Sequence, residues 1–281
     1  MAEEKQEEKK SVGIVLPTVK TPARATNLKN LLIYGKEKSG KTTAVNQLPN
    51  NLILDVENGT AFINGLIMQP PENYGPVQVF RWLKEVAKKI RDDGYPYDYV
   101  TIDTLSQLDI FAENVGTYNY MHSIAGKEFN RQKDENGKII YVKETGKSIM
   151  LRPSDPNYES VLTLPYGYGF RHTRDAILDI FETLKNLGKI CTIFVCHVAD
   201  KYMGEKDKAV IYTKDLALVG KGRDIIPRLV DGTANVWNDE GQFMISFKGN
   251  DQQIGGVRAP HLTGYVGKLD WGFIFKKEEI K

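Results

Sequence analysis

A glycine-rich octapeptide near the start of the chain has residue types and a spacing that suit phosphate chemistry. Gly35 and Gly40 are followed by Lys41 and Thr42, which fits the pattern G-x-x-x-x-G-K-[ST]. Glycines let the backbone curl so that consecutive N–H groups point at a phosphate, and the lysine and hydroxyl can meet phosphates and Mg²⁺. The sequence therefore predicts a phosphate loop for ATP with Mg²⁺, in which Lys41 reaches the β- and γ-phosphates and Thr42 holds the metal. The predicted cradle comprises Gly35, Lys36, Glu37, Lys38, Ser39, Gly40, Lys41, Thr42 and Thr43.

An aspartate ends a later apolar run, where metal-assisted phosphate chemistry needs a carboxylate. Asp103 closes the segment YDYVTID, and a carboxylate there can hold a water on Mg²⁺. We therefore predict Asp103 as the second metal residue beside Thr42, although an aspartate that only caps a turn would give the same pattern. Thr104 follows and is not acidic, so a general base for water must come from elsewhere in the chain.

Two further polar residues follow apolar runs and are candidates for that chemistry. Glu57 comes just after Leu52–Leu54, and if that strand neighbours the strand before the phosphate loop, its carboxylate can orient an attacking water. A solvated turn glutamate beside Asn58-Gly59 is the alternative. His197 ends the run 190–196, where a polar group could sense the γ-phosphate and pass its presence to the next segment. A histidine that only satisfies a strand end would look the same.

Short apolar runs and amphipathic segments alternate, and they must form the elements that position these residues. The runs 31–34, 52–54, 99–102 and 190–196 are continuous rather than alternating, which is typical of strands buried on both faces of a parallel sheet. Segments near 83–90 and 177–187 carry apolar residues at helical spacing. The turn 238–241 between 234–237 and 242–247 predicts a β-hairpin. We expect an α/β fold with a mostly parallel central sheet flanked by helices and a C-terminal β-hairpin extension.

The composition is ordinary for a globular chain and excludes few partners. Of 281 residues, 41% are hydrophobic and 26% charged, and the formal net charge is +2, so any nucleic-acid surface must be local. No apolar run reaches about eighteen residues and the N-terminus carries charges of both signs, so we expect neither a membrane span nor a signal peptide, and a cytoplasmic location. Cys191 and Cys196 fall on opposite faces of one predicted strand, which predicts reduced core thiols.

With these residues in place, the chain resembles the RecA-like branch of P-loop ATPases, and most closely the phage-encoded AAA-type nucleotide-binding proteins of DNA recombination and single-strand annealing. The resemblance covers roughly residues 28–270, and the order of its segments is more specific than the phosphate loop alone. The segments are LLIYGKEKSGKTT, LILDVENGT, YDYVTIDTLSQL, KICTIFVCH with KDLALVGKGRDIIPRLVD, and FKGNDQQIGGVRAPHLTG.

The resemblance implies roles for several residues. Glu57 takes the place of the catalytic glutamate, and His197 that of a polar sensor. Lys248 and Arg258 become candidates for basic residues that enter a neighbouring subunit's ATP site. The segment 198–220, which reads as a polar loop over 200–222, takes the place of a loop that approaches single-stranded DNA, although an ordinary solvated loop is equally compatible. Its candidate DNA-binding residues are Lys201, Tyr202, Lys206, Lys208, Tyr212 and Lys214.

The expected organisation has a charged, disordered tail at 1–12, a RecA-like ATPase domain at 13–270 with a polar insertion at about 126–165, and a C-terminal tail at 271–281. The expected function is a Mg²⁺-dependent ATPase acting on single-stranded DNA, assembled as a homo-oligomeric ring or filament, with a single-strand-binding protein as a further partner. It would work in the host cytoplasm if phage-encoded. A P-loop kinase of small molecules or nucleotides, and a non-hydrolysing ATP-dependent adaptor, remain alternatives. Common motor ATPases fit less well because residue 104 is not acidic.

Overall fold

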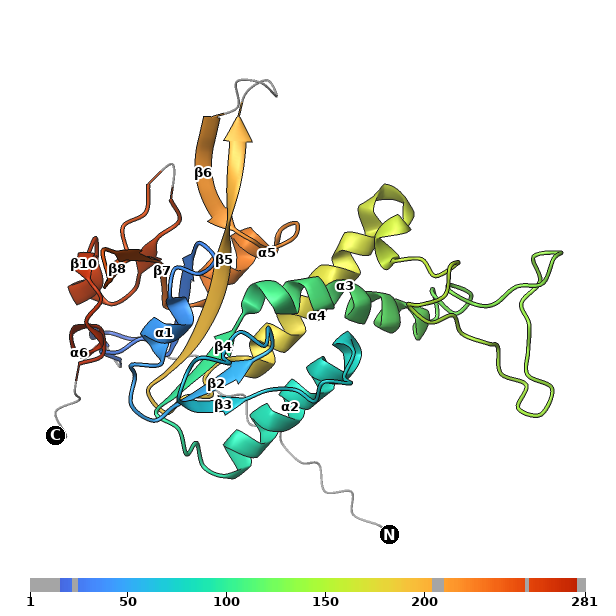
Figure 1. Cartoon of the computed structure of the whole chain (residues 1–281), viewed down its shortest axis with the longest axis horizontal. Coiled ribbons are helices and arrows are strands. Elements are labelled where there is room, and N and C mark those ends of the chain that lie inside the picture. Colours follow the sequence, from blue (N-terminus) through green and yellow to red (C-terminus); the bar gives the residue numbers. More distant parts are fainter. Residues whose placement is uncertain (1–15, 22–24, 204–209, 251–252, 277–281) are drawn as a thin grey trace, which may run out of the picture.

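The fold is seen in a computed structural model that describes residues 16–21, 25–203, 210–250 and 253–276, with side chains described outside 200–214. The predicted charged tail at 1–12 lies outside these residues. A single large sheet organises the described chain, and its main strand order is β10-β8-β7-β1-β5-β4-β2-β3 (Figure 1). The strands on this path are β1 (Asn30–Gly35), β2 (Asn51–Asp55), β3 (Leu66–Met68), β4 (Tyr99–Asp103), β5 (Cys191–Met203), β7 (Gly232–Asp239), β8 (Gln242–Ser246) and β10 (Val266–Lys268).

The central strands are parallel, as their continuous apolar runs predict. β1 pairs in parallel with both β5 and β7, and β4 joins β5 to β2. Every residue of β1, β2 and β4 is buried, which is the reason these strands lack an alternating pattern. The predicted C-terminal hairpin is present as β7 and β8, which pair antiparallel around Glu240 and Gly241.

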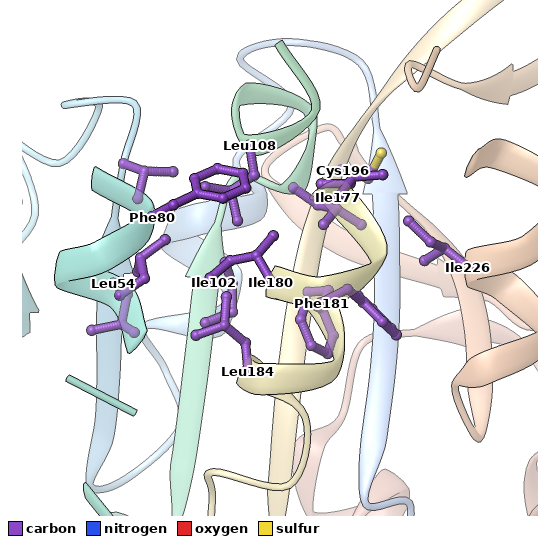
Figure 2. Close-up of a cluster of buried hydrophobic side chains, with 14 of the residues drawn as sticks. Leu54, Phe80, Ile102, Leu108, Ile177, Ile180, Phe181, Leu184, Cys196 and Ile226 are labelled. Carbon is purple, nitrogen blue, oxygen red and sulfur yellow. The ribbon is translucent and has the colours of Figure 1, made fainter. Parts of the chain in front are cut away.

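Helices cover both faces of the sheet. One face carries α2 (Pro76–Asp92), α3 (Leu105–Met121), α4 (Tyr168–Leu184) and α5 (Gly222–Leu229), and Figure 2 shows their side chains meeting those of β2, β4 and β5. The other face carries the short helices α1 (Lys41–Val45) and α6 (Trp271–Ile274). Cys196 lies in the first core and Cys191 in the second, and both are free and buried, as predicted from their spacing.

The predicted polar loop at 200–222 is wrong. β5 continues to Met203 and pairs antiparallel with β6 (Val210–Leu216), so this stretch is a β-hairpin that stands beyond the sheet (Figure 1). The charges of the segment suggested a loop, but Val210, Ile211, Tyr212 and Thr213 are residues that favour extended pairing. Helix α5 then begins inside the stretch, at Gly222.

The polar insertion between α3 and α4 extends away from the sheet as a long arm (Figure 1). Isolated antiparallel bridges join Arg131 to Met150, Lys133 to Ile139 and Tyr141 to Ser148. Two 3-10 turns, η1 (Val161–Thr163) and η2 (Pro165–Gly167), lead back into α4.

The expected C-terminal tail at 271–281 is wrong in its first part. α6 and Phe275 belong to the domain, because Ile274 is fully buried and the Trp271 Nε1 donates a hydrogen bond to the Ala44 carbonyl at 2.9 Å. The remaining short elements are β9 (Gly256–Val257), which pairs with β7, and η3 (Pro260–Leu262). None of the helices in the described part of the chain is long and apolar enough to cross a bilayer.

Candidate nucleotide-binding site

The phosphate loop connects the end of β1 to the start of α1, as its sequence predicts. Gly40 has φ 81°, in the left-handed region that glycine enters without strain. A Cβ at Gly35 would lie 2.2 Å from the Val236 carbonyl oxygen, and one at Gly40 would lie 2.5 Å from the Phe243 ring. Both glycines are therefore required by close contacts with β7 and β8 as well as by the curl of the loop.

Lys41 is held inside the loop it belongs to. Its side chain is 5% exposed, and Nζ donates to the carbonyl oxygens of Gly35 at 3.0 Å and Lys36 at 2.7 Å. Burial lowers the pKa of Lys41 from its ordinary value, against the raising effect of the Asp103 carboxylate. The ammonium group thus sits at the inner side of the loop, where a phosphate bound by the loop amides would meet it.

Thr42 and Asp103, the two residues predicted to hold a metal, lie side by side. The Thr42 Oγ1 donates to the Asp103 Oδ2 at 2.7 Å, and Asp103 is 3% exposed. Its other carboxylate oxygen, Oδ1, is buried without a hydrogen-bond partner. Burial, with smaller contributions from the Asp55 and Glu57 charges, raises the pKa of Asp103 to about 6.

This pair fits Mg²⁺. A buried carboxylate oxygen without a partner is a costly arrangement that a cation or its water would relieve. Within the described residues, no group of three or more His, Cys, Asp or Glu side chains could hold a metal. Mg²⁺ needs no such group, because it keeps several waters and commonly binds through one or two protein oxygens plus substrate phosphates. Thr42 and Asp103 would supply the protein's share.

Glu57, His197 and Lys41 form a connected polar chain beside this pair. The His197 Nε2 lies 3.1 Å and 3.2 Å from the two Glu57 carboxylate oxygens, and its Nδ1 lies 3.4 Å from the Lys41 Nζ. Because the carboxylate only accepts, Nε2 carries the proton and Nδ1 faces the lysine as an acceptor. The hydrogen bond from His197 lowers the pKa of Glu57, which keeps this carboxylate ionised at neutral pH.

The premise used to place Glu57, that its strand neighbours the strand before the phosphate loop, is wrong. β2 does not neighbour β1, because β4 and β5 lie between them. Glu57 reaches the site because the chain turns back at the end of β2, where the Val56 amide donates to the Asp103 carbonyl at 2.8 Å. The Glu57 carboxylate, which follows a strand two places from β5, thereby contacts His197. His197 in turn pairs in register with Gly35, the first residue of the loop.

Asp55 is a site residue that sequence reasoning missed. Its carboxylate accepts hydrogen bonds from the backbone amides of Glu57, Gly59 and Thr60, from the Thr60 hydroxyl at 2.6 Å and from Gln69 at 2.8 Å. Burial alone would raise the pKa of Asp55, but these hydrogen bonds lower it below its ordinary value. Asp55 fixes the turn that carries Glu57. The signal was available, since an aspartate at a strand end before Asn58-Gly59 is a typical turn former.

Helix α3 supplies further contacts to the site, and the sequence analysis did not identify them. The peptide bond before Thr104 is cis, and the Thr104 hydroxyl caps α3 by accepting from the Gln107 amide at 3.2 Å. The Ser106 hydroxyl accepts from the His197 amide at 2.9 Å. The first turn of α3 therefore anchors the backbone of the histidine that contacts Glu57.

The structure separates the two basic residues expected to act on a neighbouring subunit. Lys248 lines a cavity of about 740 Å³ that is also lined by Lys36 and Lys38 of the same chain's phosphate loop. Arg258 lies at the opposite edge of the sheet, where its guanidinium contacts Asp231 at 3.1 Å and the Arg228 carbonyl at 3.0 Å. Within one chain, Arg258 is therefore not part of the phosphate-loop site.

The candidate DNA-binding residues lie either on the β5–β6 hairpin or outside the residues that the structure describes. Lys201 and Tyr202 belong to β5, and Tyr212 and Lys214 to β6, with Asp200 paired to Lys214 and Lys201 to Thr213 in register. Lys206 and Lys208 lie outside the described residues. The hairpin begins at Val198, directly after His197, so its backbone continues from the site.

Together the fold and the site define a class. A phosphate loop follows the central strand of a mostly parallel sheet, a buried aspartate ends the strand two places away, and helices cover both faces. These are the features of a RecA-like P-loop NTPase fold, in which nucleotides bind at the carboxyl edge of the strands.

A comparison with protein families agrees with this class. A family model described as an AAA domain matches residues 28–137, a segment that contains the phosphate loop, Glu57 and Asp103. Among solved structures, the chain is similar to a prototypical ATPase from the type III secretion system of pathogenic bacteria, with 11% identity and a TM-score of 0.42. That match covers 88% of this chain and 61% of the other. No curated protein matches the chain.

Proposed function

We propose that this protein is a Mg²⁺-dependent ATPase that acts on single-stranded DNA in phage-type recombination or annealing, in the cytoplasm of the host. The observation that carries the ATPase proposal is the polar chain Glu57–His197–Lys41 beside the Thr42–Asp103 pair. An ionised carboxylate, a lysine inside a phosphate loop and a metal-binding pair are the groups that hydrolysis of a terminal phosphate needs.

In this mechanism, the chain's own residues position water and offset charge. The loop amides and Lys41 would bind the β- and γ-phosphates, and Thr42 and Asp103 would hold a Mg²⁺ ion. Mg²⁺, when bound, supplies positive charge that offsets the negative charge of the phosphates. Glu57 orients a water molecule in line with the γ-phosphorus and accepts its proton, as the new P–O bond forms and the bond to the β-phosphate oxygen breaks. His197 holds the Glu57 carboxylate in place through its Nε2 proton.

The proposal of a homo-oligomer, as a ring or filament, rests on the resemblance, because Lys248 lies beside its own chain's loop and does not itself require a second subunit. The cavity that Lys248 lines opens beside Lys36 and Lys38, so a basic group lies close to the phosphate loop within one chain. A neighbouring subunit would have to supply any additional positive charge from another surface, and Arg258 faces away from its own chain's loop. The single-stranded DNA proposal rests on the resemblance and on the hairpin that continues from His197.

The test is ATP turnover by purified protein, measured with Mg²⁺, with and without single-stranded DNA. We expect Mg²⁺-dependent hydrolysis that DNA stimulates, and its loss in Lys41→Ala. The matched control is Lys88→Ala, an exposed lysine on α2 far from the loop in sequence and on a different element. Phosphate transfer to a nucleoside monophosphate without DNA stimulation would instead indicate a kinase. Hydrolysis no faster than in Lys41→Ala, with partner binding retained, would indicate an adaptor.

A further inference from the structure

A second cavity lies at the edge of the sheet opposite the phosphate loop. Its volume is about 630 Å³, and it is lined by residues that immediately precede or begin the parallel strands β1, β4 and β5, together with α6. The phosphate loop follows the other end of β1, so the sheet separates the two sites. Nothing in the proposed ATPase mechanism uses this cavity.

Aromatic side chains form the floor of this cavity. The rings of Tyr99 and Phe275 lie 5.1 Å apart, and Phe275 stacks on Trp271 with centroids 5.9 Å apart and planes 14° apart. Tyr99 and Phe275 are each 6% exposed, so little of either ring is open to solvent. Leu48 and Pro49 add further apolar wall. A floor of this kind can receive one aliphatic or aromatic side chain.

The rim is positively charged. Lys29, Lys189 and Lys276 line the cavity and are exposed, whereas Asp98 is its single acidic residue. The Lys29 Nζ donates to the Lys189 carbonyl at 3.1 Å, which brings the first two lysines to one side of the opening. Among the ion pairs found in the described part of the chain, none involves these three lysines. Their charges remain available to a ligand.

The backbone around the rim is fixed by paired hydrogen bonds. The Asn27 amide group donates to the Lys276 carbonyl at 2.8 Å and accepts from the Lys276 amide at 2.9 Å. The hydrogen bond from the Trp271 Nε1 to the Ala44 carbonyl then joins the floor to α1. Because these hydrogen bonds join residues distant in sequence, the walls of the cavity are part of the folded domain.

We propose that this cavity binds an acidic peptide segment of a partner protein, with an apolar side chain on the aromatic floor and carboxylates on Lys29, Lys189 and Lys276. A single-stranded nucleic acid fits less well, because base stacking needs exposed ring faces along an open groove, and two of the three rings here are only 6% exposed. Such a peptide carries, in one short segment, an apolar side chain for the floor and carboxylates for the lysine rim. Its binding would leave the phosphate loop free.

The experiment uses the full chain and a fluorescent hexapeptide of four aspartates followed by leucine and phenylalanine, with affinity measured by fluorescence anisotropy. We expect saturable binding that weakens about tenfold in Lys29→Glu and in Lys189→Glu, because each variant replaces attraction by repulsion at the rim. Lys88→Glu, which makes the same charge change on α2, serves as the matched control and should bind as the unmodified protein does. A peptide with serines in place of leucine and phenylalanine should bind at least about tenfold more weakly.

Several results would overturn the proposal. Equal weakening in Lys88→Glu would mean that net charge alone attracts the peptide. Equal affinity for the serine peptide would mean that the aromatic floor takes no part. Binding of oligothymidylate that displaces the peptide and depends on Lys29 would assign the cavity to nucleic acid, and binding seen only after removal of residues 277–281 would assign it to the chain's own terminus. Under the proposal, Lys29→Glu leaves ATP turnover unchanged. A failure of the peptide-binding proposal is therefore distinguishable from a failure of the proposed ATPase function.

Discussion

At the scale of single residues, the site depends on which groups are ionised and which hydrogen bonds hold them. Glu57 is partly exposed and has its pKa lowered by the His197 hydrogen bond, whereas Asp103 is nearly covered and has its pKa raised by burial. Two carboxylates close together therefore have different proton affinities. The lowered pKa keeps Glu57 ionised, so its carboxylate can orient a water molecule, whereas the positive charge of a bound metal ion would favour the ionised form of Asp103.

The first prediction concerns Glu57. In Glu57→Gln, the side chain keeps its size but cannot accept a proton, so ATP turnover should fall about 100-fold or more while ATP binding persists. Turnover and equilibrium binding of a fluorescent ATP analogue measure the two effects. Glu85→Gln, an exposed change on α2, is the control. Unchanged turnover in Glu57→Gln would remove this residue from the mechanism.

The second prediction concerns Asp109, which is 2% exposed in α3 and accepts a hydrogen bond from the Val219 amide at 2.6 Å. Burial raises its pKa from 3.8 to about 6. The folded state therefore binds this proton more tightly than the unfolded state, and the free energy of unfolding falls as pH rises from about 4 to about 6. Above pH 6, Asp109→Asn should stabilise the protein by up to about 3 kcal/mol, because the amide avoids burying a charge.

Urea unfolding at pH 4.5 and at pH 8 measures this effect. The stabilisation by Asp109→Asn should be larger at pH 8, whereas Asp239→Asn at the exposed end of β7 should behave as the unmodified protein at both values. Parallel stability profiles for the Asp109 variant and the unmodified protein would contradict the prediction.

At the scale of elements, α4 shows how one helix divides between core and surface. Phe181 is fully buried, with its ring centroid 4.5 Å from that of Phe194 on β5, whereas Phe170 on the same helix is 49% exposed. Phe181→Ala should lower the free energy of unfolding by about 3–5 kcal/mol, because it removes contacts and leaves a cavity. Phe170→Ala is the matched control and should change stability by less than about 0.5 kcal/mol. The urea unfolding midpoints of the two variants and the unmodified protein measure these changes in stability.

The elements also show what could be predicted from sequence and what could not. The strands that carry Gly35, Asp103 and His197 were predictable because each is buried on both faces and so reads as a continuous apolar run. Helix α3 was not, because it is enclosed by its neighbours and buries adjacent polar and apolar residues, Ser106 and Asp109 beside Leu105 and Leu108, so no stripe appears. Its role as the anchor of His197 depends on that tertiary position.

The candidate site was likewise predictable only where it depends on local sequence. The phosphate loop follows from local backbone requirements, which a short pattern expresses fully. The contact of Glu57 with His197 depends on a turn fixed by Asp55, and the location of Arg258 depends on the pairing of β9 with β7. Such long-range relations leave no mark in the spacing of residues along the chain.

At the scale of the whole molecule, nucleotide binding should stabilise the entire domain. Elements from both halves of the sequence meet at the loop, since β1, β5 and β7 are adjacent and Phe243 of β8 contacts Gly40. A ligand that binds only this folded arrangement, at about 100 times its Kd, adds about 2.7 kcal/mol to the free energy of unfolding. Thermal unfolding with Mg²⁺ and a non-hydrolysable ATP analogue should show a raised Tm, absent in Lys41→Ala. An equal rise in that variant would place the nucleotide elsewhere.

β5 is one continuous strand with two different environments. It pairs with β4 up to Val195 and with β1 up to His197, and from Val198 to Met203 it pairs with β6. At about 3.3 Å per residue, Met203 lies about 20 Å beyond the histidine. The half of β5 beyond His197 therefore joins the sheet at the residue that contacts Glu57 and Lys41. A tilt of about 10° at His197 would move the backbone at Met203 by about 3 Å.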